Sequence, residues 1–343
     1  MKNIFYFILI MTFLGCEKDV PPTYLESVGS WENEIVPYKG VYASYVNSGI
    51  VEDVLIFRGV SLMFFFESDG TKKALTTSHQ QSGYHRNFFS RDFFFMKDYT
   101  RNEIRISNEQ LYYQYSDYLR PQNIDSSFTD YNFEYELGAG SDDNVAIVSL
   151  AKESAQSNIH LALFKVYNAE YNYARIDTVF GYIQVDLPAE NDIAVHRMES
   201  DGTNFYITTT ENSYRVEPNG DFQRIFDFPV REYFKYQNDW YADIENAIYK
   251  SSDDGMNWQI VADNLDYEGF RQFFTVADDL FFYDEDKVYH ITNITTFEYQ
   301  VLESRLLQGR KITSAIVYYD KVYLSTLNGI FSKPVDRLFE GLE

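Results

Sequence analysis

The last third of the chain repeats one short unit, and this repeat constrains the fold more than any other feature. The segments NDWYADIENAIYKSS from Asn238 and DDLFFYDEDKVYHIT from Asp278 align without a gap at an offset of 40 residues. Each reads as a β-strand, a polar turn and a second strand, because aromatic and β-branched residues alternate with polar ones on both sides of the turn. Two further copies, NFYITTTENSYRV and KVYLSTLNGIFSK, bring the steps between units to 35, 40 and 42 residues.

Every copy carries two aromatic residues that are eight positions apart. The pairs are Tyr206 and Tyr214, Tyr241 and Tyr249, Phe281 and Tyr289, and Tyr323 and Phe331. Residue types that tolerate the backbone angles of tight turns lie between the two rings, and we expect the turns at residues 211–212, 245–246, 285–286 and 328–329. The even separation predicts that both rings follow the same strand alternation. We interpret the rings as core positions, with a ligand-stacking array as the alternative.

A repeat of about 40 residues that carries several strands is typical of a β-propeller blade, whose sheet cannot bury both of its faces alone. The sequence therefore predicts an all-β fold, a single β-propeller over residues 27–343 with about seven four-stranded blades and six as the alternative. Blades in the first half are placed by continuity, because the repeat is degenerate there. We expect an early strand to pair with the C-terminal GIFSKPV segment, since an open ring would leave unpaired strand edges.

The N-terminal segment MKNIFYFILIMTFLGCEKD combines one early lysine with an apolar run over residues 4–14. This run is shorter than the roughly 20 residues that a membrane-spanning helix needs, so residues 1–15 are interpreted as an export signal. Gly15 and Cys16 follow the run directly, and this arrangement resembles a bacterial lipoprotein signal, in which the cysteine after the cleavage site is acylated. Phe13 and Leu14 depart from the usual residues before that cysteine.

Cys16 is the only cysteine in the chain, so an internal disulfide is impossible and lipidation is its expected role, with an ordinary free thiol as the alternative. Acyl chains contribute about 0.8 kcal/mol per buried CH₂, and several chains together give a stable anchor. The predicted order is a signal peptide at 1–15, a lipidated tether at 16–26 and the propeller. The charged residues after Cys16 resemble the export signals of Bacteroidota surface lipoproteins. That resemblance implies a membrane-anchored protein of the cell envelope at the outer membrane, with its sidedness open.

The charge balance excludes one class of partner. The chain has 29 basic and 52 acidic residues, a net charge of −23, and no stripe rich in lysine and arginine. A protein that binds nucleic acid needs clustered cations to displace the counterions of the phosphates. We therefore expect no nucleic-acid partner and interpret the charge as an acidic surface that resists association.

The segment SSDDGMNW follows one predicted strand and precedes another, and its residue types suit a connecting turn. Ser251 and Asp253 can accept hydrogen bonds from turn N–H groups, while Gly255 can adopt a positive φ. Trp258 can fill the space between neighbouring sheets. The four positions match the Asp-box motif, Ser-x-Asp-x-Gly-x-x-Trp, so the chain resembles the sialidase-type, sortilin and photosystem-assembly propellers. In those families the motif lies away from the catalytic face, which implies a structural turn here. The segment FESDGTKKAL resembles a degenerate second copy.

Local catalytic and metal-binding motifs are missing from the sequence. The Arg-Ile-Pro signature of sialidases is absent, and the five histidines show no zinc spacing, although His79 and His85 share one loop-like stretch. The acidic YDEDK segment lacks the ligand series of a calcium loop and is interpreted as a hairpin tip. We expect no metal site, no cofactor and no catalytic residue. Two carboxylates from distant strands would leave no local signature, however, so glycoside hydrolysis stays open.

Two phenylalanine triplets, residues 64–66 and 93–95, predict strands that are covered on both faces, with an exposed docking patch as the alternative. Taken together, the sequence favours a membrane-anchored binding or scaffolding module for a protein or glycan, and no enzymatic activity. The alternatives are a glycan-active hydrolase with dispersed carboxylates on the central face of the propeller, and a structural subunit of an envelope complex.

Overall fold

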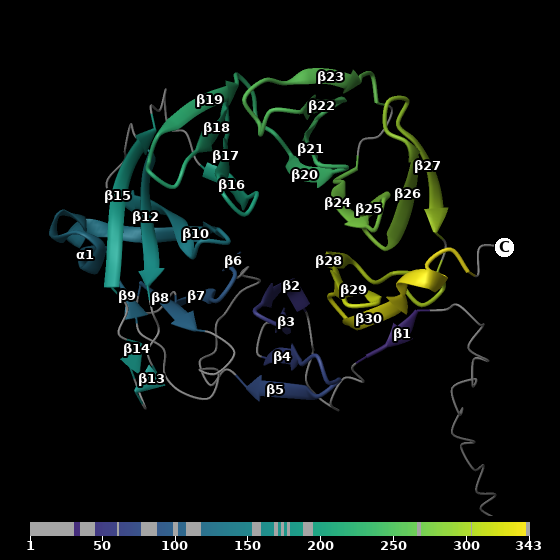
Figure 1. Cartoon of the computed structure of the whole chain (residues 1–343), viewed down its shortest axis with the longest axis horizontal. Helices are drawn as coiled ribbons and strands as arrows, with labels where there is room; N and C mark the ends of the chain where they lie inside the picture. Colours follow the sequence, from purple (N-terminus) through teal and green to yellow (C-terminus); the bar gives the residue numbers. More distant parts are fainter. Residues whose placement is uncertain are drawn as a thin grey trace, which may run out of the picture.

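The structure is a computed structural model that describes residues 31–34, 45–59, 62–76, 88–98, 102–107, 118–152, 159–167, 171–172, 175–176, 179–187, 195–265, 269–302 and 304–340. These residues form seven four-stranded antiparallel sheets and one two-stranded ribbon. The sheets stand side by side as blades around a closed ring (Figure 1). The prediction of a single all-β propeller is confirmed, and seven sheets agree with the preferred number of blades.

We number the blades 1 to 7 along the chain, and the first strand of each blade lies nearest the centre of the ring (Figure 1). Blades 1 and 2 consist of β2 (Tyr45–Val51), β3 (Val54–Gly59), β4 (Leu62–Phe66) and β5 (Lys72–Thr76), then β6 (Phe88–Phe89), β7 (Phe94–Asp98), β8 (Glu103–Ser107) and β9 (Tyr118–Leu119). Blades 3 and 4 consist of β10 (Tyr131–Gly140), β11 (Val145–Lys152), β12 (Ile159–Tyr167) and β15 (Val179–Leu187), then β16 (Val195–Ser200), β17 (Phe205–Thr209), β18 (Ser213–Val216) and β19 (Phe222–Phe226).

Blades 5 and 6 consist of β20 (Glu232–Tyr236), β21 (Asp239–Ile244), β22 (Ala247–Ser251) and β23 (Gln259–Ala262), then β24 (Gln272–Val276), β25 (Asp279–Asp284), β26 (Lys287–Asn293) and β27 (Glu298–Leu302). Blade 7 consists of β28 (Ile312–Tyr318), β29 (Lys321–Thr326), β30 (Gly329–Pro334) and β1 (Glu32–Asn33). Outside the blades lie α1 (Pro121–Ile124), η1 (Ser126–Asp130), the ribbon of β13 (Tyr171–Asn172) and β14 (Arg175–Ile176), and η2 (Val335–Arg337).

The ring is closed by β1, the outermost strand of blade 7. Glu32 pairs with Ser332 and Asn33 with Phe331, which confirms the predicted pairing of an early strand with the GIFSKPV segment. The next residue, Glu34, accepts hydrogen bonds from Ser332 in blade 7 and from Lys72 in blade 1. Burial alone would raise the pKa of Glu34, but these donors hold it below its usual range. Closure therefore joins three segments that are distant in the sequence.

The aromatic pairs are core residues, as predicted, but their two rings lie on opposite faces of each sheet. Seven of the eight rings are buried, and Tyr249 is half-buried. Tyr241 is opposite Lys250, whereas Tyr249 is opposite Ala242. The expected shared alternation was wrong because a two-residue turn places directly opposed residues an odd number of positions apart. The turns at residues 245–246 and 285–286 are confirmed, while the other two lie one residue earlier, at 210–211 and 327–328.

This arrangement gives each interface one ring from either side. Tyr241 of blade 5 and Tyr289 of blade 6 belong to the same buried cluster between those blades. Phe281 of blade 6 and Phe331 of blade 7 meet in the next cluster. The first ring of a repeat therefore packs against the following blade, and the second ring packs against the preceding one. Both sheet faces are buried in this way, which a propeller blade requires.

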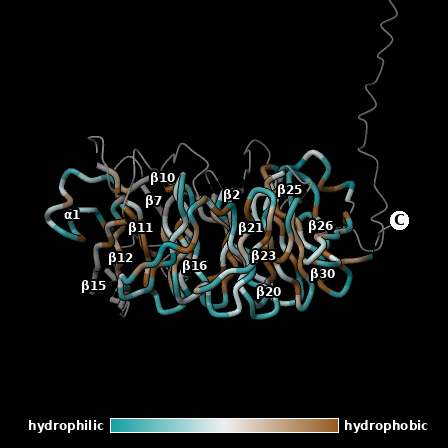
Figure 2. Tube along the Cα trace, turned by 90° about the horizontal axis from the view of Figure 1, so that it is seen from above, coloured by the Kyte–Doolittle hydropathy of each residue, from teal (hydrophilic) through white to brown (hydrophobic). Residues whose placement is uncertain are grey.

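Both phenylalanine triplets are fully inside the ring, so the alternative of an exposed docking patch is wrong. All six side chains are buried. Phe64 and Phe66 pack toward blade 7, whereas Phe65 packs toward blade 2 beside Phe94. Seen edge-on, the hydrophilic residues collect at the turns above and below the strands (Figure 2).

Antiparallel meandering strands place successive turns on alternate faces of the ring, and we name the two faces by their turns. The tip face carries the turns at residues 210–211, 245–246, 285–286 and 327–328, together with the connections from one blade to the next. The motif face is the opposite face and carries the turn at residues 251–258. In the described part of the chain no helix is long and apolar enough to cross a membrane. The predicted signal peptide, Cys16 and the tether at 16–26 lie outside the described residues.

Candidate functional site

The four residues of the SSDDGMNW segment form one hydrogen-bonded turn between β22 and β23. The Ser251 hydroxyl donates to Asp253 Oδ1 (2.7 Å) and accepts from the Gly255 N–H (2.9 Å). Asp253 also accepts from the backbone N–H of Asn257 (2.8 Å) and from its side-chain amide (2.6 Å). Hydrogen bonds from Asn257 and Ser251 lower the pKa of Asp253 to about 2. The carboxylate is thus fully used within the turn.

Gly255 and Trp258 join this turn to the interface between blades 4 and 5. Gly255 has a φ of +79°, and a Cβ atom there would lie 2.6 Å from the hydroxyl of Tyr206. The Trp258 indole donates to the Gly255 carbonyl (2.9 Å), and its ring centroid lies 5.2 Å from that of Phe226. The turn therefore serves architecture, and its membership of the Asp-box class stays a prediction. The degenerate copy also lies between a third and a fourth strand, and Gly70 has a φ of +84° there.

The histidines do not meet in a common site. His290 contacts Asp279 (3.0 Å), His160 lies 3.4 Å from the Tyr131 hydroxyl, and His196 is exposed. His79 and His85 lie outside the described residues. Over the part of the chain that the structure describes, no group of three or more His, Cys, Asp or Glu side chains is placed to hold a metal ion.

A buried ionic network, which sequence reasoning missed, joins the first strands of blades 4, 5 and 6. Arg197 of β16 donates through Nε to Glu199 Oε1 (2.7 Å) and through Nη1 to the carbonyl of Arg231 (2.7 Å). Its Nη2 atom lies 2.6 Å from Glu199 and 3.5 Å from Glu232 Oε2. Two carboxylates from neighbouring blades therefore share one guanidinium group.

Each carboxylate in this network also binds the backbone of the following blade. Glu199 Oε2 accepts from the Tyr233 N–H (2.9 Å), and Glu232 Oε1 accepts from the Phe273 N–H (3.1 Å). Next to Glu232, Asp243 accepts two hydrogen bonds from Arg271 (3.2 and 2.5 Å), and both of these side chains are fully buried. The network thus holds three blades together at the centre of the ring.

Burial dominates the titration of this network. It raises the pKa of Glu232 to about 8 and that of Asp243 to about 6, although Arg197 and Arg271 oppose the shift. Removal of a carboxylate from water disfavours its charged form unless its partners compensate fully. Glu232 Oε2 is buried and has no hydrogen-bond donor, which explains why compensation is incomplete.

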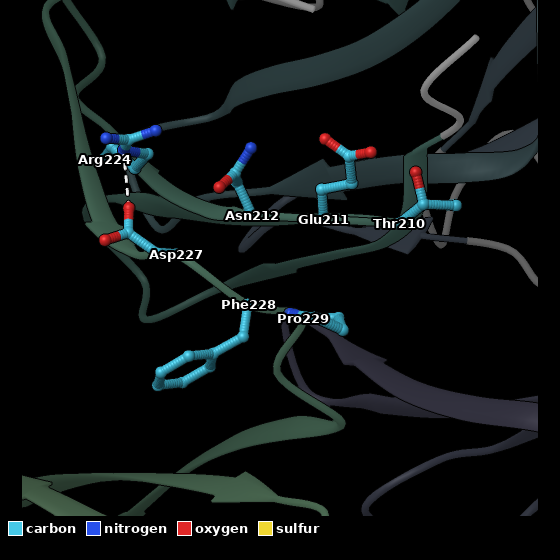
Figure 3. A pocket seen from close by; sticks show the side chains of 7 residues that line it. All are labelled: Thr210, Glu211, Asn212, Arg224, Asp227, Phe228 and Pro229. Atoms are coloured by element: carbon cyan, nitrogen blue, oxygen red, sulfur yellow. Dashed lines mark ion pairs between the residues drawn. The ribbon is translucent and has the colours of Figure 1, made fainter. Parts of the chain in front are cut away.

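The only volume near these residues is on the tip face of blade 4, where a polar cavity of about 520 Å³ opens to solvent. It lies between the β17–β18 turn and the β19–β20 connection, residues 227–231. Its lining residues are Thr210, Glu211, Asn212, Arg224, Asp227, Phe228 and Pro229 (Figure 3). Arg224 is paired with Asp227 at 3.0 Å, and Asn212 is only 9% exposed.

The cavity exists because blade 4 lacks a contact that the next two blades have. In blade 5 the Leu265 N–H donates to the carbonyl of the tip residue Asn246 (3.0 Å). In blade 6 the Gly309 N–H donates to the tip residue Asp286 (2.5 Å). Within the described part of blade 4, no hydrogen bond joins the tip at 210–212 to residues 227–229. The tip and the connection therefore stand apart and leave space between them.

Fold and site together define a closed β-propeller with a buried ionic centre and a polar cavity on its tip face. No protein-family model matches the chain, and no curated protein matches it in sequence.

Several solved structures share the fold. Virginiamycin B lyase from Staphylococcus aureus is similar with a TM-score of 0.60 at 10% identity, over 89% of this chain and 99% of the lyase. The extracellular domain of the putative hybrid two-component system BT4673 from B. thetaiotaomicron is similar with a TM-score of 0.57 at 12% identity, over 89% of this chain and 39% of that one. YCF48, solved in complex with D1 peptide, is similar with a TM-score of 0.52 at 10% identity, over 89% of this chain and 94% of YCF48. These likenesses show the fold and carry no activity with them.

Proposed function

We propose that the protein is a membrane-anchored envelope lipoprotein whose propeller binds a protein or glycan partner on its tip face. The cavity of blade 4 carries this proposal, because it is open and contains a buried amide, that of Asn212, with no hydrogen-bond partner among the described residues. Buried polar groups in native proteins are nearly always satisfied by protein, water or ligand. A partner that supplies those hydrogen bonds would complete the site.

The direction of β1 supports an outward-facing tip face. Trp31 precedes β1, which is antiparallel to β30, and β30 begins at the tip turn of residues 327–328. Trp31 therefore lies on the side of the ring that faces away from the tips. An anchor at Cys16 would join the propeller from that side and would leave the tip face free for a partner. The resemblance to an extracellular domain and to a propeller solved with a peptide is in keeping with a binding role.

Glycoside hydrolysis is the second candidate, because Glu199 and Glu232 contact the same Arg197 Nη2 atom. Their carboxylates therefore lie within about 6 Å of each other, close to the spacing of about 5–5.5 Å in retaining glycosidases. Three observations favour the binding role. Glu232 is 6% exposed, its Oε2 atom is buried, and both carboxylates bind backbone N–H groups of the next blade. A substrate could not reach Glu232 without opening the ring.

The binding role is tested by immobilising the purified protein and passing envelope extract over it, with proteins identified by mass spectrometry and glycans by sugar analysis. We expect a partner that is retained by the native protein and lost by Glu211→Lys, which reverses an exposed charge at the cavity. Glu298→Lys reverses an exposed charge at the start of β27 and serves as the matched control. Equal retention by both variants, or no specific retention, would refute the proposal. Release of reducing sugar that disappears in Glu232→Gln would instead favour the hydrolase.

A further inference from the structure

We infer that the cavity of blade 4 binds the ring of a neutral sugar. This inference rests on the proposed binding role and specifies the ligand of the same site. Four observations carry it: the buried amide of Asn212, the sign of the charges, the aromatic ring of Phe228, and the rigid wall behind it.

The amide of Asn212 is the polar centre of the cavity. Its backbone is fixed by Thr209, whose hydroxyl accepts from the Asn212 N–H (2.9 Å) and donates to its carbonyl (3.0 Å). The residue is 9% exposed, and its side-chain amide makes no hydrogen bond to the described protein. An amide offers two donors and one acceptor that can take two hydrogen bonds. A sugar hydroxyl both donates and accepts, so adjacent hydroxyls match this group.

The charges around the amide disfavour an anionic ligand. Glu211 and Asp227 contribute two carboxylates, whereas the single cation, Arg224, is already paired with Asp227 at 3.0 Å. A carboxylate is an acceptor that hydroxyl groups can satisfy, and a charge-assisted hydrogen bond of this kind is stronger than a neutral one. A uronate, a sialate or a phosphate would be repelled. The cavity therefore fits a neutral ligand with many hydroxyl groups.

Phe228 gives the cavity an apolar side opposite the polar one. Figure 3 shows Phe228 and Pro229 across from Thr210, Glu211 and Asn212. The Phe228 ring is half-buried and stacks on Phe226 with centroids 5.1 Å apart, which fixes its orientation. A sugar ring has hydroxyl groups at its rim and C–H groups on its faces, so it matches a cavity with one polar and one aromatic side.

The wall that carries Phe228 is held in place without a ligand. The Ser213 hydroxyl donates to the Phe228 carbonyl (3.0 Å) and accepts from the Val230 N–H (3.1 Å). One residue further along, Arg197 holds the Arg231 carbonyl (2.7 Å), so the ionic network of the ring anchors the same connection. A site that is formed in advance loses little conformational entropy on binding. The volume of about 520 Å³ lies within the range of small-molecule pockets, about 300–1,000 Å³.

The inference is tested on a printed array of neutral, anionic and amine-bearing oligosaccharides, with affinities for retained probes measured by calorimetry. We expect retention of neutral oligosaccharides, and a loss of roughly tenfold or more in affinity for Asn212→Ala, which removes up to three hydrogen bonds. Asn246→Ala, at the tip of blade 5 outside the cavity, should bind like the native protein. A melting curve for each variant shows that it is folded.

Retention of anionic glycans alone, no retention of any glycan, or equal affinity for Asn212→Ala would overturn the inference. The envelope-extract experiment separates this failure from that of the binding role. A protein partner that Asn212→Ala still retains would leave the tip face as a binding surface while removing the sugar site. If neither glycan nor protein is retained by the native chain, both proposals fall.

Discussion

Replacing Gly255 with alanine tests whether the turn at residues 251–258 is built into the interface between blades 4 and 5. Two costs are expected. The φ of +79° is unfavourable for any residue with a Cβ atom, by roughly 1–2 kcal/mol. The added Cβ would also lie 2.6 Å from the Tyr206 hydroxyl, and overpacking of this kind costs about 1–3 kcal/mol.

Tyr206 cannot move aside easily, so the second cost should appear in full. Its side chain is 1% exposed, and its ring lies between those of Tyr233 and Trp240, with centroid distances of 4.7 and 5.5 Å. Its hydroxyl also donates to Asp201 (3.1 Å). We therefore expect Gly255→Ala to lower the free energy of unfolding by roughly 2–5 kcal/mol.

The matched control is Gly70→Ala, in the equivalent turn of blade 1. Gly70 has a φ of +84°, but nothing lies within 4 Å of the position that a Cβ would take. The backbone cost and the smaller entropy of the unfolded chain are then common to both variants, and only the contact with Tyr206 differs. Urea unfolding at constant pH should show Gly255→Ala to be less stable than Gly70→Ala by about 1–3 kcal/mol. Equal stability of the two variants would refute the reasoning.

Three further predictions concern the centre of the ring, the motif and the anchor. Because burial raises the pKa of Glu232 to about 8 and that of Asp243 to about 6, the folded chain keeps protons that the unfolded chain releases near pH 4. The free energy of unfolding should therefore fall between about pH 5 and 8, by on the order of a few kcal/mol, and Glu232→Gln should flatten that slope in urea titrations. An unchanged slope in this variant would contradict the assignment. Asp253→Ala removes three acceptor contacts of the turn and should lower the melting temperature without changing ligand affinity, so a selective loss of affinity would argue for a functional motif. Cys16→Ser should move the protein from the membrane fraction to the soluble fraction after cell lysis, and retention in the membrane would exclude the anchor.

The parts of the fold that could be predicted from the sequence are those that repeat. The step near 40 residues predicted the blades, and the need to pair every edge predicted the contact of β1 with β30. The faces of the aromatic pairs were predicted wrongly, because the number of residues in the turn decides which positions oppose each other. Tyr241 opposes Lys250 and not Tyr249, and counting along the sequence alone does not reveal that one-residue difference.

The ionic network could have been found from the same repeat. Arg231-Glu232 and Arg271-Gln272 stand at the start of two first strands with an offset of 40, where the surrounding residues are strand-like and aromatic. Arg197, Glu232 and Gln272 take equivalent places, opposite Thr208, Asp243 and Tyr283. A charged residue at a recurring core position is a usable signal, because burial of a charge demands a partner. Which residues become those partners depends on the contact between blades, and this the sequence does not contain.

The cavity of blade 4 lies beyond sequence reasoning for a different physical reason. It results from a contact that blades 5 and 6 make through Leu265 and Gly309 and that blade 4 does not make. A repeat is recognised by what its copies share, whereas a binding site on a symmetric ring must be where one copy differs from its neighbours. The residues that differ at this place are also those that a ligand would touch, and the same connection is held rigid by Arg197 from the centre of the ring. The conserved architecture thus supplies a stiff frame, and the local exception within it supplies the site.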